Sequence, residues 1–150
     1  MSGTQDYNQI VDAFSCYKDA AETEWRYGYM SVLSFVLCTR PGITEILRIL
    51  RQVYNLLLPG GSCQILHANW ELSNGLDFPS FVLERCTALE NGTPVHITLK
   101  SSLPVKIQDY YYARSEYTDL LRQAGFEHAT VTEVFDSDKR SPFYIISASK

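Results

Sequence analysis

The sequence lacks the short motifs that mark several common classes of enzyme. It contains neither GxSxG nor a P-loop, the signatures of many hydrolases and of nucleoside-triphosphate enzymes. Its three histidines, His67, His96 and His128, are 29 and 32 residues apart, so the spacings HxxxH and HExxH are also missing. These absences argue against a metal site, against a hydrolase of the GxSxG type and against an enzyme that uses nucleoside triphosphates.

Long hydrophobic runs are missing as well. The most apolar stretch, Met30 to Cys38, is far shorter than the roughly 20 residues that span a bilayer. The N-terminus has neither the basic nor the apolar segment of a signal peptide. The four cysteines form no CxxC pair, which is typical of free thiols in a reducing compartment. We therefore expect a cytoplasmic protein that does not enter a membrane.

The composition is that of one globular domain. Of the 150 residues, 45% are hydrophobic and 20% are charged, enough for a single core. Thirteen basic residues stand against seventeen acidic ones, and no basic run interleaves with aromatic residues. A nucleic-acid partner is therefore not expected.

Hydrophobic periodicity predicts an α/β fold. Residues 6–21 place apolar side chains three and four positions apart and predict a helix. The run 31–38 predicts a strand covered on both faces, and a helical stripe follows from Ile43 to Leu57. Because 63–68 is again apolar, residues 31–68 predict a parallel strand-helix-strand unit.

The second half of the chain is predicted to be mostly antiparallel. Asn91-Gly92 suggests a hairpin between the apolar runs 81–89 and 95–99. Ser115 is a candidate N-cap for a helix that ends at Gly125. Two closing strands are expected, and these are residues 130–135 and 143–149.

Two motifs resemble those of class I S-adenosylmethionine-dependent methyltransferases. Leu58-Pro59-Gly60-Gly61 is similar to the family's "LkPGG", which ends the helix before the fifth strand, and residues 117–126 are similar to the helix that ends in "aGF". The match covers residues 31–150. It implies an α/β fold with a Rossmann-like sheet, helices packed on it, and a mixed sheet that ends in an antiparallel hairpin.

The family's Gly-rich cofactor loop has no counterpart in this sequence. No two of its eight glycines are separated by a single residue, so there is no GxG anywhere. We interpret the region near Tyr29 as the site of an internal deletion that removes the first three strands. The expected organisation is then one truncated domain, 1–150, in which 1–29 is similar to the family's N-terminal cap helix and 30–150 to the C-terminal half of its core.

The resemblance implies candidate cofactor-binding residues. Ser34 and Phe35 correspond by position to the end of the fourth strand, which lines S-adenosylmethionine in the family; the alternative, that both are plain strand core, is favoured. Tyr7 corresponds to an aromatic residue that closes over the cofactor, although it could instead pack on the sheet. Trp25 could cover the same pocket or could join the cap to the core.

Candidate substrate-binding residues lie at the carboxyl end of the next strand and just before the last long helix. His67 and Asn69 lie where open α/β sheets bind ligands, but a loop histidine and a turn asparagine would look the same. Tyr111 and Tyr112 occupy a region where the family places substrate-facing aromatic residues, and they could also be core. The neighbouring Asp109 could act as a base or could be solvated. No catalytic residue is assigned.

Two functions of different classes remain open. The first is an S-adenosylmethionine-dependent methyltransferase-like protein that acts on a small molecule and is impaired by loss of the cofactor loop. The second is a non-catalytic binding or regulatory subunit. In either case the apolar strand 31–38 would lack its flanking strands. We therefore expect a homodimer or a complex with a full-length homologue.

Overall fold

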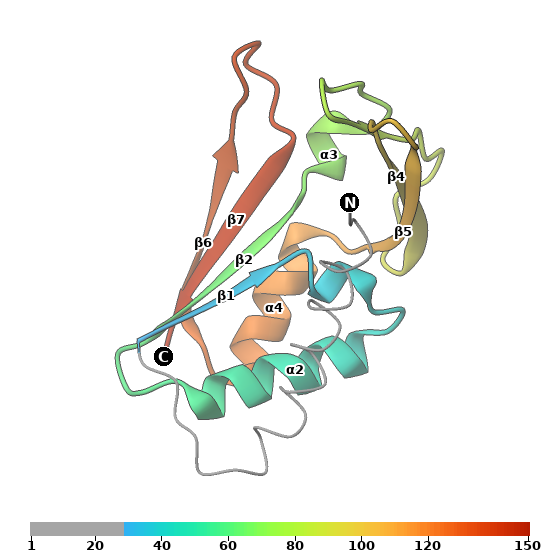
Figure 1. Ribbon diagram of the computed structural model, residues 1–150. Helices are drawn as coiled ribbons and strands as arrows, with labels where there is room; N and C mark the ends of the chain where they lie inside the picture. Colours follow the sequence, from blue (N-terminus) through green and yellow to red (C-terminus); the bar gives the residue numbers. More distant parts are fainter. Residues whose placement is uncertain (1–28) are drawn as a thin grey trace.

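The computed structural model describes residues 29–150, which form two β-sheets and the helices around them (Figure 1). Sheet A has the strand order β1-β2-β7-β6. Its strands are β1 (Met30–Ser34), β2 (Ser62–Ala68), β7 (Phe143–Ser149) and β6 (Glu127–Val134). The first two strands are parallel, and β7 is antiparallel to both of its neighbours.

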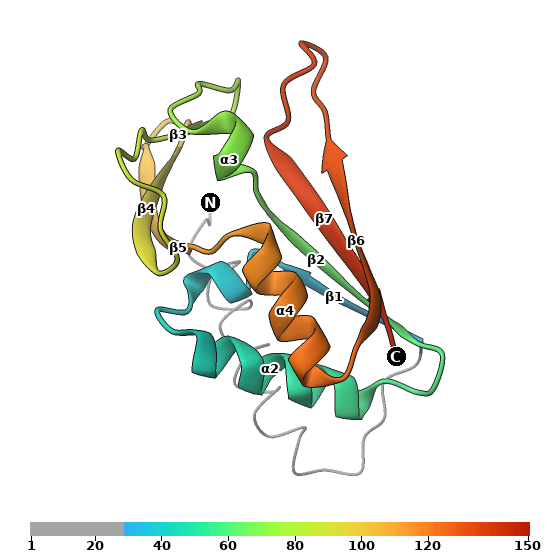
Figure 2. The ribbon, with the colours of Figure 1, turned by 180° about the vertical axis from the view of Figure 1, so that it is seen from behind.

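Sheet B is separate and entirely antiparallel. Its strands, in order, are β3 (Phe81–Leu83), β4 (Thr93–Leu99) and β5 (Val105–Tyr111). The helices are η1 (Leu37–Thr39), α2 (Ile43–Leu56), α3 (Trp70–Ser73) and α4 (Arg114–Ala124). Both views of the ribbon show α2 and α4 on the same face of sheet A, with sheet B beyond the carboxyl ends of β1 and β2 (Figures 1 and 2).

The parallel strand-helix-strand unit predicted for residues 31–68 is confirmed. Met30 pairs with Ser62 and Ser34 with Leu66, and α2 makes the crossover between the two strands. Ile46, Leu50 and Val53 on α2 are buried in the core beneath the sheet, as their spacing predicts. Leu47 is only half-buried and Ile43 is exposed, so the apolar stripe is wider than the buried face.

The strand predicted for residues 31–38 is shorter than expected. It ends at Ser34 because Phe35 adopts a left-handed backbone conformation, with φ of 54°, and the chain then turns into η1. Within residues 29–150, α2 and α4 cover one face of the sheet: Leu33 is buried, whereas Met30 and Val32 are 61% and 58% exposed. The helix predicted for residues 6–21, which was expected to cover a face of the sheet, lies outside the described residues.

The second half of the chain follows the predicted order with three corrections. The run 81–89 forms a strand only over Phe81–Leu83, and it pairs with β4. Strand β5 was not predicted, and it makes a third strand of sheet B. The N-cap position of α4 is Ala113, whose side chain makes no capping hydrogen bond, rather than Ser115.

The end of α4 and the two closing strands agree with the prediction. Gly125 has φ of 109°, and its amide binds the carbonyl groups of the last helical turn. A Cβ at Gly125 would lie 3.0 Å from the Tyr54 ring, so α4 and α2 approach closely there. Strands β6 and β7 form the antiparallel hairpin that closes sheet A.

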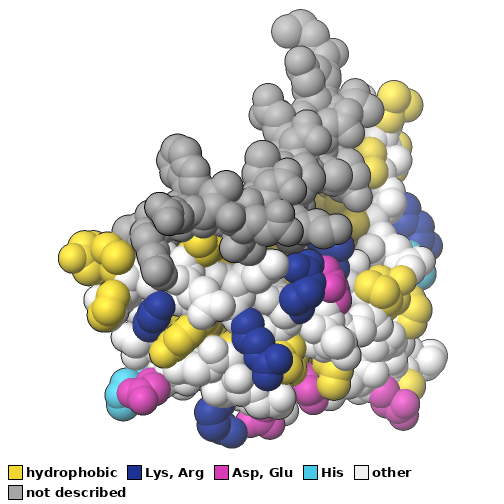
Figure 3. Space-filling model, turned by 90° about the horizontal axis from the view of Figure 1, so that it is seen from below, with side chains coloured by type: hydrophobic (Ala, Val, Ile, Leu, Met, Phe, Trp, Pro, Cys, Tyr) yellow, Lys and Arg dark blue, Asp and Glu magenta, His cyan; other side chains and the backbone are white. Residues whose placement is uncertain are grey.

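The outer surface of the two helices is polar. Figure 3 views the molecule from the side of α2, and basic and acidic side chains are interspersed on that face. Exposed ion pairs join Arg48 to Glu45 and Arg122 to Asp119. No helix within residues 29–150 is long and apolar enough to cross a membrane. Cys38, Cys63 and Cys86 are free thiols.

We predict that Leu50→Ala lowers the free energy of unfolding by about 2–5 kcal/mol, because Leu50 is fully buried between α2 and the sheet. Chemical denaturation measures this change. Ile43→Ala, on the same helix but 46% exposed, is the matched control and should cost less than about 1 kcal/mol. Equal effects of the two substitutions would show that the packing face is wrongly assigned.

Candidate functional site

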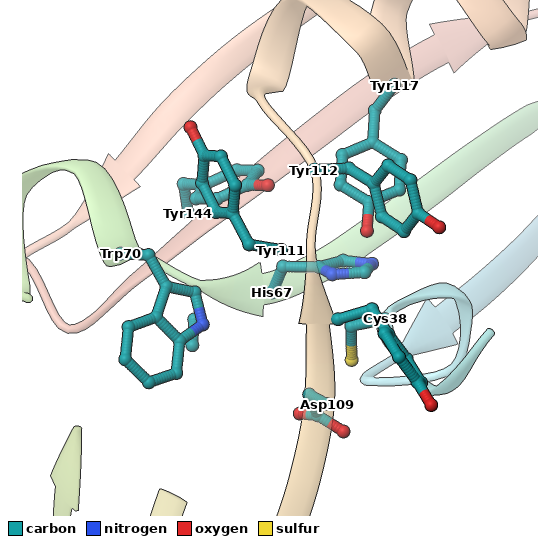
Figure 4. A pocket seen from close by; sticks show the side chains of 10 residues that line it. Cys38, His67, Trp70, Asp109, Tyr111, Tyr112, Tyr117 and Tyr144 are labelled. Carbon is teal, nitrogen blue, oxygen red and sulfur yellow. The ribbon is translucent and has the colours of Figure 1, made fainter. Parts of the chain in front are cut away.

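A small pocket lies where the carboxyl ends of β1 and β2 meet sheet B. Six structural elements contribute to it, and its lining residues are Cys38, His67, Ala68, Trp70, Asp109, Tyr110, Tyr111, Tyr112, Tyr117 and Tyr144 (Figure 4). The volume open to the centre of a water molecule is about 10 Å³, roughly what a single water requires.

Cys38 and Asp109 form the acidic side of this pocket. Both are buried, and Cys38 reaches the pocket because the turn at Phe35 directs the chain into η1. Burial, together with the adjacent Asp109 carboxyl, raises the pKa of the Cys38 thiol well above its usual value. Burial also raises the pKa of the Asp109 carboxyl, and a hydrogen bond with Cys38 opposes that shift. The alternative that Asp109 is solvated is therefore wrong.

His67 and Tyr117 bring unpaired polar atoms into the same region. The Nε2 atom of His67 and the hydroxyl group of Tyr117 are buried and have no hydrogen-bond partner within the described part of the chain, residues 29–150. Their rings pack with centroids 4.6 Å apart. Complete burial lowers the pKa of His67 to about 3, so this imidazole is neutral at pH 7. Buried polar atoms without partners are rare in folded proteins, and they mark this pocket as a place where a ligand or water can bind.

Tyr111 and Tyr112 contribute their rings rather than their hydroxyl groups. The Tyr111 hydroxyl donates to Glu71 Oε1 at 3.2 Å, and the Tyr112 hydroxyl donates to the carbonyl of Arg40 at 3.2 Å. Burial, with Glu71 nearby, raises the pKa of Tyr111 to about 12. Both rings line the pocket with their hydroxyl groups already engaged.

Asn69 lies outside this lining and has structural contacts. Its side-chain oxygen caps α3 by accepting from the Leu72 amide, and it also accepts from Arg114 Nη2 at 2.6 Å. Its side-chain amide donates to Ser141 Oγ at 2.8 Å. Of the four candidate substrate-binding residues, the structure thus brings His67, Tyr111 and Tyr112 together and places Asn69 behind them.

Arg114 joins the elements around the pocket. Its guanidinium group pairs with Glu133 Oε1 at 2.8 Å and with Glu71 Oε2 at 3.1 Å. It also lies 5.0 Å from the centroid of the Tyr144 ring. These contacts connect α4 with α3, β6 and β7, and they hold the Tyr144 and Tyr111 rings in position.

The candidate cofactor-binding residues do not line the pocket. Ser34 is exposed at the end of β1. Phe35 is half-buried and packs edge-on against Phe143, with ring centroids 5.6 Å apart. Tyr7 and Trp25 lie outside the described residues. The same is true of the predicted cap region 1–29, except for its last residue.

Sequence reasoning missed several residues of the pocket. Cys38 was assigned to a strand, and Tyr117 was recognised only as the first residue of the segment 117–126, which is similar to a helix of the family. Trp70 and Tyr144 carried no signal, because a lone aromatic residue in an apolar context looks like core. Asp109 offered the one clue, since an acidic residue immediately precedes three tyrosines.

Solved structures with a similar fold are methyltransferases. The CcbJ methyltransferase from Streptomyces caelestis aligns over 84% of this chain and 61% of its own, with a TM-score of 0.54 and 15% identity. An S-adenosylmethionine-dependent methyltransferase from Clostridium acetobutylicum aligns over 85% and 59%, with a TM-score of 0.55 and 9% identity. No protein-family model and no curated protein matches the sequence.

A third neighbour contains the cofactor. The glycopeptide N-methyltransferase MtfA, solved in complex with S-adenosylmethionine, aligns over 84% of this chain and 55% of its own, with a TM-score of 0.54 and 15% identity. Residues 29–150 thus have an α/β fold of the type seen in S-adenosylmethionine-dependent methyltransferases. The chain spans about six-tenths of the length of these neighbours.

The pocket does not fit S-adenosylmethionine. A volume of about 10 Å³ holds one water-sized group, whereas the cofactor carries an adenosine and an amino-acid chain. Among the described residues, the end of β1 offers an exposed serine and a phenylalanine whose ring is packed against Phe143. The residues at this edge of the described structure therefore do not form a site that could hold S-adenosylmethionine.

We predict that His67 makes the protein sensitive to acid. The unfolded chain binds a proton below pH 6.5, whereas buried His67 stays neutral down to about pH 3, so stability falls as the pH drops below 6.5. Between pH 7.5 and pH 5 this residue should remove about 2 kcal/mol from the free energy of unfolding.

Urea denaturation across this pH range measures the effect. His67→Gln should reduce the change in the free energy of unfolding between pH 7.5 and pH 5 by about 2 kcal/mol, whatever its effect on the stability at pH 7.5. His128→Gln, a substitution on the exposed surface, is the control and should leave the profile unchanged. An unaltered profile for His67→Gln would contradict the assigned burial.

Proposed function

We propose that this protein is an S-adenosylmethionine-dependent methyltransferase-like protein that binds a small molecule in the pocket between sheets A and B, with impaired affinity for the cofactor. One observation carries the proposal. A pocket at the carboxyl edge of a methyltransferase-type sheet contains the buried, unpaired polar atoms of His67 and Tyr117. Open α/β sheets bind their ligands at this edge.

The impairment is proposed because the groups that usually hold the cofactor are missing from the sequence. A Gly-rich loop lets the backbone approach a nucleotide closely, and this sequence contains no GxG. Without an acidic residue on the ribose hydroxyls, each buried hydroxyl left unpaired costs about 1–3 kcal/mol. Since each 1.4 kcal/mol is a tenfold loss, the combined cost is about tenfold or more in affinity.

We predict that isothermal titration calorimetry detects weak or no binding of S-adenosylmethionine to the full chain. A dissociation constant above about 100 µM, or no measurable heat, is the expected result. Adenosine, which shares the base and the ribose, is the control for non-specific nucleoside binding. Saturable binding in the low-micromolar range, seen with S-adenosylmethionine and not with adenosine, would contradict the proposed impairment.

We further propose that the chain pairs with a second copy or with a complete homologue through β1. This strand lies at one end of the order β1-β2-β7-β6 among the described residues. Its outward side chains Met30 and Val32 are exposed, and an apolar edge strand is a template for association. Such pairing would suit a non-catalytic binding subunit as well as a methyltransferase.

Sedimentation equilibrium at tens of micromolar tests the pairing. We expect a species larger than the 17.1 kDa monomer, and Val32→Lys should shift it toward the monomer by placing a charge at the interface. Val131→Lys on β6, at the other end of sheet A, is the matched control. A monodisperse species near 17.1 kDa for the unsubstituted chain would rule out self-pairing.

A further inference from the structure

The polar groups of the pocket are complementary to a hydrogen-bond donor with a positive charge. Asp109 supplies a carboxyl group, and the Tyr117 hydroxyl has no partner. The neutral imidazole of His67 can present Nε2 as an acceptor when its proton is on Nδ1. Among residues 29–150, those that line the pocket include no lysine or arginine.

Arg114, a cation that contacts one of the lining residues, is already neutralised. Arg114 contacts the Tyr144 ring, but its guanidinium group is held by Glu71, Glu133 and Asn69. It therefore does not supply a counter-charge for Asp109.

The aromatic lining favours the same kind of ligand. Six aromatic side chains surround the cavity, and these are Trp70, Tyr110, Tyr111, Tyr112, Tyr117 and Tyr144. The faces of aromatic rings carry negative electrostatic potential and attract cations within about 6 Å. Rings and a carboxyl group in one pocket together disfavour carboxylate or phosphate ligands, which would be repelled by both.

The size of the cavity selects among cations. Its volume of about 10 Å³ accepts one group of the size of water. A primary ammonium group is of this size and carries three N–H donors, which matches the number of acceptors offered by Asp109, His67 and Tyr117. A quaternary ammonium group is larger and has no N–H donor.

We infer that this pocket binds the primary ammonium head group of a small organic amine, with the rest of the molecule extending out of the cavity. This inference rests on the proposed function, and it names the class of the small molecule. The Asp109 carboxyl group contributes the charge, and the Tyr117 hydroxyl and His67 Nε2 accept the remaining hydrogen bonds.

NMR titration of the full chain without any cofactor tests the inference, with methylammonium chloride, tetramethylammonium chloride and methanol as probes. The two salts share a charge but differ in size, whereas methanol has the size of methylammonium without its charge. So small a probe makes few contacts, so we expect saturable methylammonium binding with a millimolar dissociation constant and shifts centred on the pocket. The other two probes should not saturate.

Two substitutions locate the binding. Asp109→Asn should weaken methylammonium binding by about tenfold or more, because the charged acceptor is lost. The matched control is Asp119→Asn, which removes the same charge from the exposed surface of α4 and should leave methylammonium binding unchanged. Tyr117→Phe removes only a hydroxyl group and should weaken binding about threefold or more, which keeps the test available if Asp109→Asn fails to fold.

The outcomes separate this inference from the proposed function. Equal binding of methanol or tetramethylammonium would overturn the amine assignment, as would no saturable methylammonium binding at up to about 0.1 M. The cavity would then hold only a structural water. Methylammonium binding without any S-adenosylmethionine binding supports the amine site, whereas the reverse result removes it and leaves the methyltransferase-like function standing.

Discussion

The structure depends on the parallel pairing of β1 with β2. Parallel strands cannot be joined by a tight turn, so the chain must cross over, and α2 provides the crossover and covers one face of the sheet. The same pairing brings both carboxyl ends to one edge. There the chain continues from β1 into η1 and from β2 into α3, and sheet B packs against this edge (Figure 1). The pocket exists because the two strands end side by side.

The pocket opposes stability, which favours a functional origin for its polar residues. A neutral, fully buried histidine and an unpaired tyrosine hydroxyl both cost free energy relative to apolar side chains of similar shape. Burial of Asp109 also costs free energy, because the native environment disfavours its charged form and raises its pKa. Titratable groups with strongly shifted pKa values that gather in one cleft are typical of binding and catalytic sites.

The ion pairs and hydrogen bonds around Arg114, which lie behind the pocket, stabilise the fold. Arg114, Glu71, Glu133 and Asn69 satisfy one another through ion pairs and hydrogen bonds, and Asn69 also binds Ser141 next to the start of β7. This network links both closing strands of sheet A to α3 and α4. It therefore fixes the walls of the pocket while leaving His67 Nε2 and the Tyr117 hydroxyl unengaged.

The sequence by itself determined the parallel unit, the stripes of α2 and α4, the turn at Gly125 and the closing hairpin, because periodicity and glycine conformation are local properties. It also placed His67, Tyr111 and Tyr112 among the candidate site residues, from their positions at the carboxyl end of β2 and before α4. Only the tertiary structure decided the left-handed turn at Phe35, the third strand of sheet B and the burial of Asp109, because each depends on long-range contacts. Cys38 and Tyr117 join His67 in one pocket for the same reason: they come from η1 and α4, which are distant from β2 in the sequence and adjacent only in the fold.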